Sequence, residues 1–405
     1  MKKLIILILI LVITLFTYSK EVTYEILVNS AMKNNSTIKV KDLELKKISN
    51  NLKIINTDNF PTIKLSDRVN KDENREKLNY SNSISLDKKI FDGGLKKYNK
   101  KKENVNIQMK NIEISKEKKQ IKYEILVNYL DILKYKNQKN IYENSLKELE
   151  KEQEKQKLLY KEKAGKKQDL LTIETEILDV KANMIKNNSN YLITIEELKR
   201  ITGENEEIEL KNIEYEKMYI DLEKDIENYK KSSDDIKNIN LQNDINMLDK
   251  KIIKSKDYPV VSFNANYSSN SDELSKIFKD WDWSLGVSLS YDIFDGGKKK
   301  IEYENSDITG KINKMNSDEI IKENIIAIKK KYYELKNDEL LIENQNKKIE
   351  GLEENYKIVK IQYEYGVEDI NTFLKIKNDL ENSKINLINL KLDYILKYAE
   401  YRMGL

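Results

Sequence analysis

Two short glycine-containing segments carry side chains that could pair with each other. The first segment, around Gly165, is mainly basic, and the second, around Gly366, is mainly acidic. Opposite charges invite ion pairs, and an exposed pair contributes about 0.2 to 1 kcal/mol. We predict ion pairs between the lysines of the first segment and the carboxylates of the second, and a hydrogen bond from Tyr363 to Asp169; alternatively, all these charges point to solvent. The candidate site residues are Lys166, Lys167, Asp169, Tyr363, Glu368, Asp369 and Thr372.

The chain of 405 residues has no histidine and no cysteine, which limits the chemistry that it can perform. These residues supply the commonest general base, the commonest transition-metal ligands and the thiol nucleophile. The 69 acidic and 73 basic residues leave a net charge of only +4 and are typical of solvated helix surfaces. We therefore expect no enzyme, no catalytic residue, no metal, no cofactor and no nucleic-acid partner.

An internal duplication of the sequence indicates which strands and helices position the two segments. The tetrapeptide Phe-Asp-Gly-Gly occurs twice, and each copy separates a strand-like segment from a long charged one; the only two prolines, Pro61 and Pro259, precede the strand regions. A period of roughly 200 residues is too long for a solenoid unit, so the chain consists of two related halves. We expect each aspartate to cap a helix and the glycines to adopt positive φ at the strand-to-helix junctions. The junction residues are Phe91, Asp92, Gly93, Gly94, Phe294, Asp295, Gly296 and Gly297.

Alternation of apolar and polar residues predicts two pairs of strands, at about 61–70 and 80–91 and at about 260–269 and 284–294. Each segment is about the 9 to 11 residues that a tilted strand needs to cross a bilayer. Two soluble hairpins, each with one buried face, are the alternative. Both interpretations require further partners, because a two-stranded hairpin is not stable alone in water.

Long helices follow each pair of strands. Between Gly94 and Gly165 there is neither glycine nor proline, which allows a continuous helix on the order of 100 Å. From Phe373 to Tyr401 apolar residues recur at the 3-4 spacing of a coiled-coil seam, and a second seam on a rotated face starts at Ile385. A helix with apolar neighbours on two sides fits the wall of a water-filled tube, although an ordinary dimeric or trimeric coiled coil is the alternative.

The N-terminal residues have the pattern of a secretory signal. Lys2 and Lys3 precede an apolar run from Leu4 to Phe16, and small residues follow. We expect a signal peptide at residues 1–19, cleaved after Ser19. A single membrane anchor is the alternative, but the apolar run is shorter than the roughly 20 residues of a spanning helix.

These features together resemble the TolC family of outer-membrane efflux proteins, from about Thr23 to Leu405. The resemblance rests on the leader, the two halves, the proline before each strand pair, the repeated Phe-Asp-Gly-Gly and the two hairpin ends. It implies an α+β fold made mainly of long α-helices. Three chains would each give four strands to one 12-stranded transmembrane β-barrel, which an α-helical periplasmic barrel continues.

The resemblance also implies a division of the chain. Residues 20–203 form a first structural repeat, with a helix, two strands and a helical hairpin whose tip is near residue 165. Residues 204–257 form an equatorial segment and a helix, without a strand. Residues 258–405 form the second repeat, with a hairpin tip near residue 366. The hairpin tips of relatives close a periplasmic aperture, so the paired residues are expected to form a gate. Here Glu368 stands where relatives commonly have a basic residue, and Thr372 and Lys375 stand where acidic ones are expected.

The function implied is that of a passive exit duct in the outer membrane of a Gram-negative-type cell, extending into the periplasm. As a homotrimer surrounded by outer-membrane lipid, it would serve a tripartite efflux or type I secretion system and be opened by a periplasmic adaptor (membrane fusion) protein and an inner-membrane pump. The alternative is a non-channel surface or periplasmic coiled-coil protein, an adhesin or an adaptor. An adaptor is expected to carry a lipoyl-like or β-barrel segment between its helices, and an adhesin does not need two strand pairs bounded by the same motif.

Overall fold

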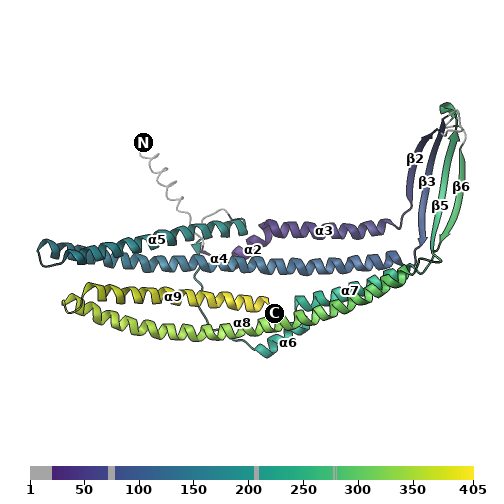
Figure 1. The fold of residues 1–405 in the computed structure, drawn as a ribbon. Helices are drawn as coiled ribbons and strands as arrows, with labels where there is room; N and C mark the ends of the chain where they lie inside the picture. The colour runs from purple at the N-terminus through teal and green to yellow at the C-terminus, as the bar shows by residue number, and fades with distance from the viewer. Residues whose placement is uncertain (1–20, 72–77, 205–208, 277–278, 280) are drawn as a thin grey trace, which may run out of the picture. The chain divides into compact units, whose positions relative to one another are not determined.

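The computed structural model describes residues 21–71, 78–204, 209–276, 279 and 281–405. The expected signal peptide, residues 1–19, lies outside them. The described chain is mostly helical, with one four-stranded sheet and one two-stranded sheet (Figure 1). It divides into two compact units: Met1–Lys39, Lys116–Tyr229 and Asn324–Leu405 form the first, and Val40–Ser115 and Lys230–Glu323 form the second. In the described part of the chain, no helix has the length and apolar character of a membrane span.

The second unit contains an antiparallel sheet in the order β2-β3-β5-β6, with β2 and β6 at its edges (Figure 1). The strands are β2 (Thr62–Asn70), β3 (Asn79–Phe91), β5 (Val260–Ser271) and β6 (Asp282–Ser290), and a short 3-10 helix, η1 (Leu274–Lys276), follows β5. The strand expected at about 284–294 starts and ends earlier than predicted. Its last residue, Ser290, pairs with Val260, and Pro259 before Val260 has no N–H with which to extend the ladder.

The register of the sheet separates an apolar face from a polar one. Ile63 lies opposite Leu86, Leu86 opposite Ala265, and Ala265 opposite Leu285, and residues opposite each other in an antiparallel pair share a face. The mainly apolar face carries Ile63, Leu65, Val69, Ile84, Leu86, Phe263, Tyr267, Trp283, Leu285, Val287 and Leu289, and the polar residues Asp67, Asn82, Lys88 and Ser269 share it. The other face is formed by Thr62, Lys64, Ser66, Arg68, Ser81, Ser83, Ser85, Asn264, Asn266, Ser268, Ser284 and Ser288. On the edge strands the apolar side chains are exposed, Leu65 by 69% and Val287 by 68%.

Helices continue the sheet within the second unit. Most of α3 (Ser36–Thr57), all of α7 (Asp234–Ser255), and the beginnings of α4 (Leu95–Lys161) and α8 (Lys298–Glu364) belong to it. Ion pairs join these helices, with Lys110 Nζ 2.6 Å from Glu44 and Lys102 Nζ 2.6 Å from Asp249. They are largely at the surface, where each pair contributes about 0 to 1 kcal/mol, so they orient the helices more than they stabilise them.

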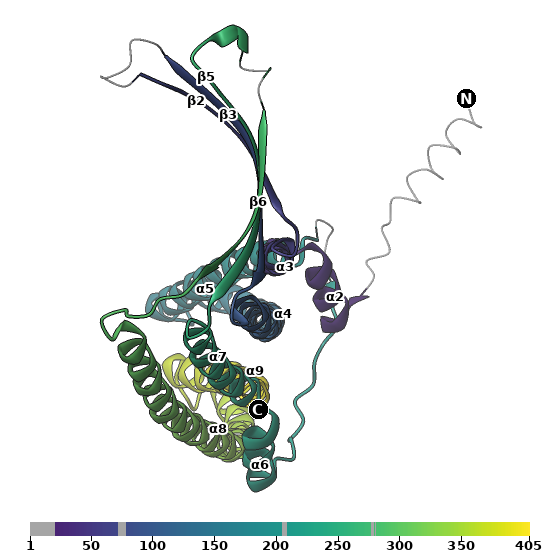
Figure 2. The ribbon, with the colours of Figure 1, turned by 90° about the vertical axis from the view of Figure 1, so that its right-hand side faces the viewer.

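The first unit is built from two helical hairpins. In both views α5 (Lys167–Thr202) runs back along α4, and α9 (Ile370–Met403) runs back along α8 (Figures 1 and 2). One cluster of buried side chains includes Leu27, Ile125, Leu130, Leu133, Leu198 and Leu392. A second cluster consists of Leu149, Ile173, Ile177, Val180, Val359, Ile370, Phe373 and Leu374. The second cluster takes residues from all four hairpin helices and therefore holds the two hairpins together.

The sequence predicts one helix at the start of the first repeat, but the structure has two helices there. They are α2 (Tyr24–Asn34) and α3, separated at Asn35. Asn35 has extended backbone angles, and its Oδ1 accepts hydrogen bonds from the N–H groups of Thr37 at 2.9 Å and Ile38 at 3.4 Å. An asparagine that satisfies these backbone groups ends one helix and starts the next.

The segment 204–257 also differs from the prediction of a single helix without a strand. It contains β4 (Glu209–Leu210), which pairs in parallel with β1 (Glu21–Val22), and two helices, α6 (Leu222–Ser232) and α7. Tyr129 of α4, only 1% exposed, donates a hydrogen bond of 2.6 Å to the carbonyl of Lys211 and fixes this strand against the helices. A strand of two residues is too short to show any periodicity in the sequence.

Candidate functional site

The two helical hairpins end in turns of one type, the Schellman motif, in which a residue in the left-handed conformation follows the helix. In the turn between α4 and α5 that residue is Lys163, with φ of +59°, and in the turn between α8 and α9 it is Gly366, with φ of +72°. The backbone hydrogen bonds correspond one to one: Ala164 to Leu159 (2.8 Å) and Lys163 to Tyr160 (3.1 Å) in the first turn, Val367 to Gln362 (2.8 Å) and Gly366 to Tyr363 (3.0 Å) in the second.

This correspondence differs from the one that the two glycines suggest in the sequence, where the hairpin ends were placed around Gly165 and Gly366. Because Lys163 takes the left-handed position, Gly165 corresponds to Glu368. Asp169 and Thr372 then lie at the same distance from the turn, although in the sequence Asp169 lies closer to its glycine. The two hairpin ends therefore correspond more closely than their glycines indicate.

The charged residues of the turns are engaged mainly with their own helices. Asp369 is the N-cap of α9, and its Oδ1 accepts a hydrogen bond of 2.8 Å from the N–H of Thr372. This bond holds the pKa of Asp369 below its usual value, with a smaller contribution from Lys166. In the described part of the single chain, neither Lys166 nor Lys167 forms an ion pair with Glu368 or Asp369. Pairing of the two hairpin ends in the assembled channel stays a prediction.

Tyr363 joins the two hairpins, but not through the predicted partner Asp169. Its hydroxyl donates a hydrogen bond of 2.5 Å to Glu152 Oε1 of α4 and accepts one of 2.8 Å from Gln156 Nε2. Burial, followed by the bond to Glu152, raises the pKa of the Tyr363 hydroxyl, so it stays neutral and remains a donor. The ring stacks on Phe373 at 4.8 Å between centroids and 7° between planes. The predicted bond fails because Asp169 lies in the first turn of α5, whereas Tyr363 packs against α4.

A second polar link lies further along the same helices. Glu148 of α4 accepts hydrogen bonds from Tyr356 Oη and, at 2.5 Å, from Lys360 Nζ, both on α8. Burial opposes the ionisation of Glu148, but the bonds from Lys360 and Tyr356 outweigh it and lower the pKa of this carboxyl. The link is therefore charge-assisted at neutral pH, which makes it stronger than a neutral hydrogen bond.

A third link is made by Lys377 of α9, which is only 1% exposed. Its Nζ donates to Ser145 Oγ of α4 and, at 2.6 Å, to Glu381 Oε1 one turn further along α9. A buried ammonium group needs both a counter-charge and hydrogen-bond acceptors, and these two partners supply them.

We call these three links the hairpin seam. It consists of Ser145, Glu148, Glu152 and Gln156 on α4, Tyr356, Lys360 and Tyr363 on α8, and Lys377 and Glu381 on α9. Of these residues only Tyr363 was predicted from the sequence. A signal existed for three of the others, since Ser145 and Glu152, like Tyr356 and Tyr363, are separated by one heptad, the spacing of residues that face a partner helix. In a chain so rich in lysine and glutamate, this polar line does not stand out.

Comparison with known proteins gives a family match over part of the chain and a fold. Residues 231–400 match the model of the outer membrane efflux protein family. Among curated proteins, no sequence matches the chain.

Three solved structures show the likeness in fold. CusC, described in connection with transmembrane channel formation, has a TM-score of 0.82 at 12% identity, covering 96% of this chain and 93% of CusC. The CmeC outer membrane channel of Campylobacter jejuni has a TM-score of 0.78 at 12% identity, covering 94% of this chain and 85% of CmeC. The MtrE outer membrane channel of Neisseria gonorrhoeae, solved in the open state, has a TM-score of 0.77 at 12% identity, with coverages of 94% and 88%.

The family match lies on the second repeat, from α7 through both of its strands to the end of the second hairpin. The shared fold extends over nearly the whole chain. At 12% sequence identity, this likeness shows the fold alone. Both agree with the repeated junction motif and the paired hairpins described above: residues 231–400 are similar to the outer membrane efflux protein family, and the chain has the fold of solved outer-membrane channels.

Proposed function

We propose that three copies of this chain form a passive exit duct whose periplasmic end is held closed by the hairpin seam. The match of residues 231–400 to the outer membrane efflux protein family, together with the fold shared with outer-membrane channels, supports an outer-membrane duct for efflux with its helices in the periplasm. The family consists of transport channels and not of enzymes, which supports a role without catalysis.

The observation that carries the proposal is the sheet with one exposed apolar face and two unpaired edges. β2 and β6 lie at opposite edges, and each has nine exposed residues. Lipid supplies no partners for unpaired backbone groups, so a sheet that enters a membrane must close on itself. β6 of one copy would pair with β2 of the next and run antiparallel to it, and three copies would close a barrel of 12 strands.

The two faces of the sheet support the same arrangement. In a barrel of this size the apolar face is expected to contact lipid and the serine- and asparagine-rich face to line the water-filled pore. Trp283, which is 73% exposed, lies opposite Tyr267, and Trp281 stacks on Tyr267 with 4.6 Å between centroids. These aromatic side chains sit near the η1 end of the strands, as expected of an aromatic girdle at one membrane interface.

The hairpin seam supports the closed periplasmic end. The seam is polar and lies beside the apolar cluster around Leu149 and Phe373, so its bonds hold the second hairpin against the first in one defined arrangement. Breaking a hydrogen bond to a charged group costs about 1.5 to 3 kcal/mol, and three-fold symmetry multiplies what one chain supplies. An adaptor protein and a pump would overcome this by binding the hairpin ends, where Tyr365 and Val367 are 82% and 73% exposed.

Planar bilayers test the proposal directly. Detergent-extracted full-length protein is expected to be a trimer by light scattering and to insert with a low, stable conductance. Replacing Tyr363 by Phe and Glu148 by Gln in the same chain removes the hydroxyl of one seam link and the negative charge of another, and is expected to raise the conductance of each inserted trimer. A stable monomer without conductance contradicts the channel, whereas a conducting trimer unaffected by the two changes contradicts only the gate.

A further inference from the structure

The strand-to-helix junctions of the two halves have the same backbone. In the first junction, residues 91–94, the two glycines have φ of +67° and +89°, and in the second junction, residues 294–297, they have φ of +69° and +87°. In each, the aspartate accepts hydrogen bonds from two backbone N–H groups, at 3.0 and 2.9 Å for Asp92 and at 3.0 and 3.1 Å for Asp295. The two junctions therefore present equivalent surfaces to a neighbour.

The turns that lead into the two strand pairs are also alike. We call residues 57–60 the first leading turn and residues 255–258 the second. In each, the hydroxyl of the first residue bonds the carbonyl three residues earlier, and the N–H of the last residue bonds the carbonyl of the first. These bonds are Thr57 to Ile54 (2.7 Å) and Phe60 to Thr57 (2.8 Å), and Ser255 to Ile252 (2.6 Å) and Tyr258 to Ser255 (3.3 Å). The chain thus has two junctions and two leading turns.

One junction and one leading turn are packed together within the chain. A Cβ atom on Gly93 would lie 2.2 Å from the carbonyl oxygen of Ser255 and 3.0 Å from Cβ of Tyr258. The rings of Phe91 and Tyr258 meet edge to face, with 6.5 Å between centroids and 87° between planes. The first junction therefore needs glycine for close approach to the second leading turn, in addition to needing it for positive φ.

The other junction and the other leading turn have no such partner in the described chain. Around Gly296 no atom lies within 4 Å of the position of a Cβ atom. Phe294 is 88% exposed and Phe60 is 72% exposed, whereas Phe91 is 46% exposed. Glycine at position 296 thus leaves space that no described residue of the chain fills. The rings of Phe60 and Phe294, which correspond to the packed pair, face solvent.

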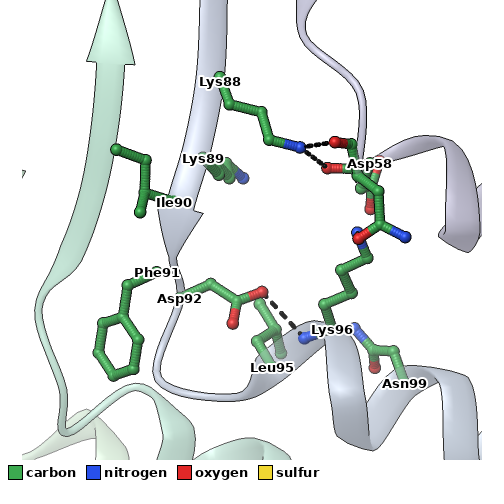
Figure 3. Close-up of a pocket in the computed structure, with 10 residues that line it drawn as sticks. Asp58, Lys88, Lys89, Ile90, Phe91, Asp92, Leu95, Lys96 and Asn99 are labelled. Carbon is green, nitrogen blue, oxygen red and sulfur yellow. Dashed lines mark hydrogen bonds between the residues drawn. The ribbon is translucent and has the colours of Figure 1, made fainter.

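A cavity lies where the missing partner would sit. Beside the first leading turn, a cavity of about 370 Å³ is lined by Asp58, Asn59 and Phe91, among others (Figure 3). The corresponding cavity beside the second leading turn has about 240 Å³ and is bordered by Asp92 of the packed junction as well as by Tyr258. No residue of the second junction lines the first cavity at the position that Asp92 takes beside the second one. This is the space that a neighbouring copy would fill.

We propose that the second junction of one copy packs onto the first leading turn of the next copy, as the first junction packs onto the second leading turn within a chain. The occupant is a second copy of this chain, because only the repeat supplies the matching backbone. The second junction adjoins β6 and the first leading turn adjoins β2, at opposite edges of the sheet. When two copies form one such contact, one copy keeps an unoccupied second junction and the other keeps an unoccupied first leading turn. Such a head-to-tail contact ends only when the copies close into a ring. The inference rests on the proposed trimer and names the contact that closes it.

Cysteine pairs test this contact, since the chain contains no cysteine of its own. Phe60→Cys combined with Phe294→Cys, treated with a short bis-thiol reagent in detergent-extracted full-length protein, is expected to give a covalent trimer on a denaturing gel. Either single variant is expected to stay monomeric there. Co-expression of the two single variants with different tags is expected to give one covalent dimer that carries both tags. The matched control is Phe91→Cys with Tyr258→Cys, which should cross-link within one chain and migrate as a monomer.

The outcomes separate the contact from the trimer. If light scattering shows a trimer and the control pair reacts, but the Phe60 and Phe294 cysteines give no product larger than a monomer, the proposed contact is wrong and the channel stands. If the protein is not a trimer, both proposals are wrong. A covalent trimer together with the tagged dimer supports a head-to-tail contact, because a two-fold symmetric contact would end at a covalent dimer.

Discussion

Lys163 and Gly366 hold the same place in the two hairpin turns: each is the left-handed residue of a Schellman motif, with φ of +59° and +72°. For Gly366 this conformation is free of strain, and no atom lies within 4 Å of a Cβ built there. For Lys163 the Cβ atom crowds the following carbonyl, which costs about 1 to 2 kcal/mol. The first turn therefore stores strain that the second does not.

Exchanging the residue types at these two positions should shift local stability in opposite directions. Gly366→Ala is expected to weaken its turn by about 1 kcal/mol, and Lys163→Gly to strengthen its own by up to about 1 kcal/mol, since the glycine's greater freedom in the unfolded chain offsets part of the relief. Amide hydrogen exchange of Val367 and Ala164, which each donate a bond of 2.8 Å across their turn, measures both effects. Ala164→Gly is the control and should not slow amide exchange in the first turn. Slower exchange in this variant would mean that the left-handed conformation of Lys163 is not the cause of the strain.

Removing only the hydroxyl of Tyr363 should loosen the closed end. Tyr363→Phe keeps the stacking on Phe373 but deprives Glu152 and Gln156 of their partner, at about 1 to 3 kcal/mol per chain. Single-channel conductance is expected to rise. Tyr365→Phe makes the same chemical change on a side chain that is 82% exposed and should leave the conductance of the parent unchanged. Equal conductance in all three proteins would mean that the seam does not limit the pore.

Acid should open the same end through Glu148. Bonds from Lys360 and Tyr356 outweigh burial and lower the pKa of Glu148 from 4.5, so the folded state stabilises the ionised form. The stabilisation is fully present above about pH 4.5 and is lost as the pH falls through the lowered pKa of the folded state. Conductance is thus expected to be constant from neutral pH down to that value and to rise below it. The Glu148→Gln variant should conduct more than the parent at neutral pH and should lack the rise in conductance at low pH that protonation of Glu148 causes. If the variant shows the same rise at low pH as the parent, other carboxylates cause that rise.

The sequence was sufficient to predict the strands and long helices because their patterns extend over many residues. Alternation across Val287 and Leu289 identified β6, and the absence of glycine and proline between Gly94 and Gly165 allowed α4. Breaks that depend on single side chains were missed, such as the division of α2 from α3 at Asn35. Local hydrogen bonding decides such a break, and periodicity does not report it.

The candidate site was predicted less well, for a different physical reason. The sequence placed Tyr363 at the hairpin end but gave it Asp169 as a partner, because both lie near a turn glycine. The structure pairs Tyr363 with Glu152, which lies on α4 before the turn. Lys377 was missed entirely, since nothing in the sequence separates this buried lysine from the exposed ones. Partner choice across helices depends on how the hairpins pack, which no local pattern specifies.

Charge reversal tests the predicted pairing of the two hairpin ends. Because Asp369 caps α9, its charge should be removed by Asp369→Asn, which keeps the capping oxygen. Combined with Glu368→Lys, this is expected to raise conductance at low salt, where screening is least. Adding Lys166→Glu and Lys167→Glu should restore the closed level. If the first double variant conducts like the parent, the charges of the two ends point to solvent.

A pair of adjacent arginine substitutions on β6 tests which face of the sheet meets lipid. Val287 lies opposite Phe263 on the apolar face, whereas the neighbouring Ser288 points to the other face, with its Oγ 3.1 Å from Asn264 Oδ1. An arginine facing lipid near the bilayer midplane costs about 2 to 4 kcal/mol, and one facing a water-filled pore costs little. Val287→Arg is therefore expected to reduce the yield of folded trimer strongly and Ser288→Arg only slightly. Both variants place the same side chain in the same strand, so differences in strand propensity cannot explain a difference in yield. A greater loss from Ser288→Arg would reverse the assignment of the two faces, and equal losses would mean that neither face contacts lipid.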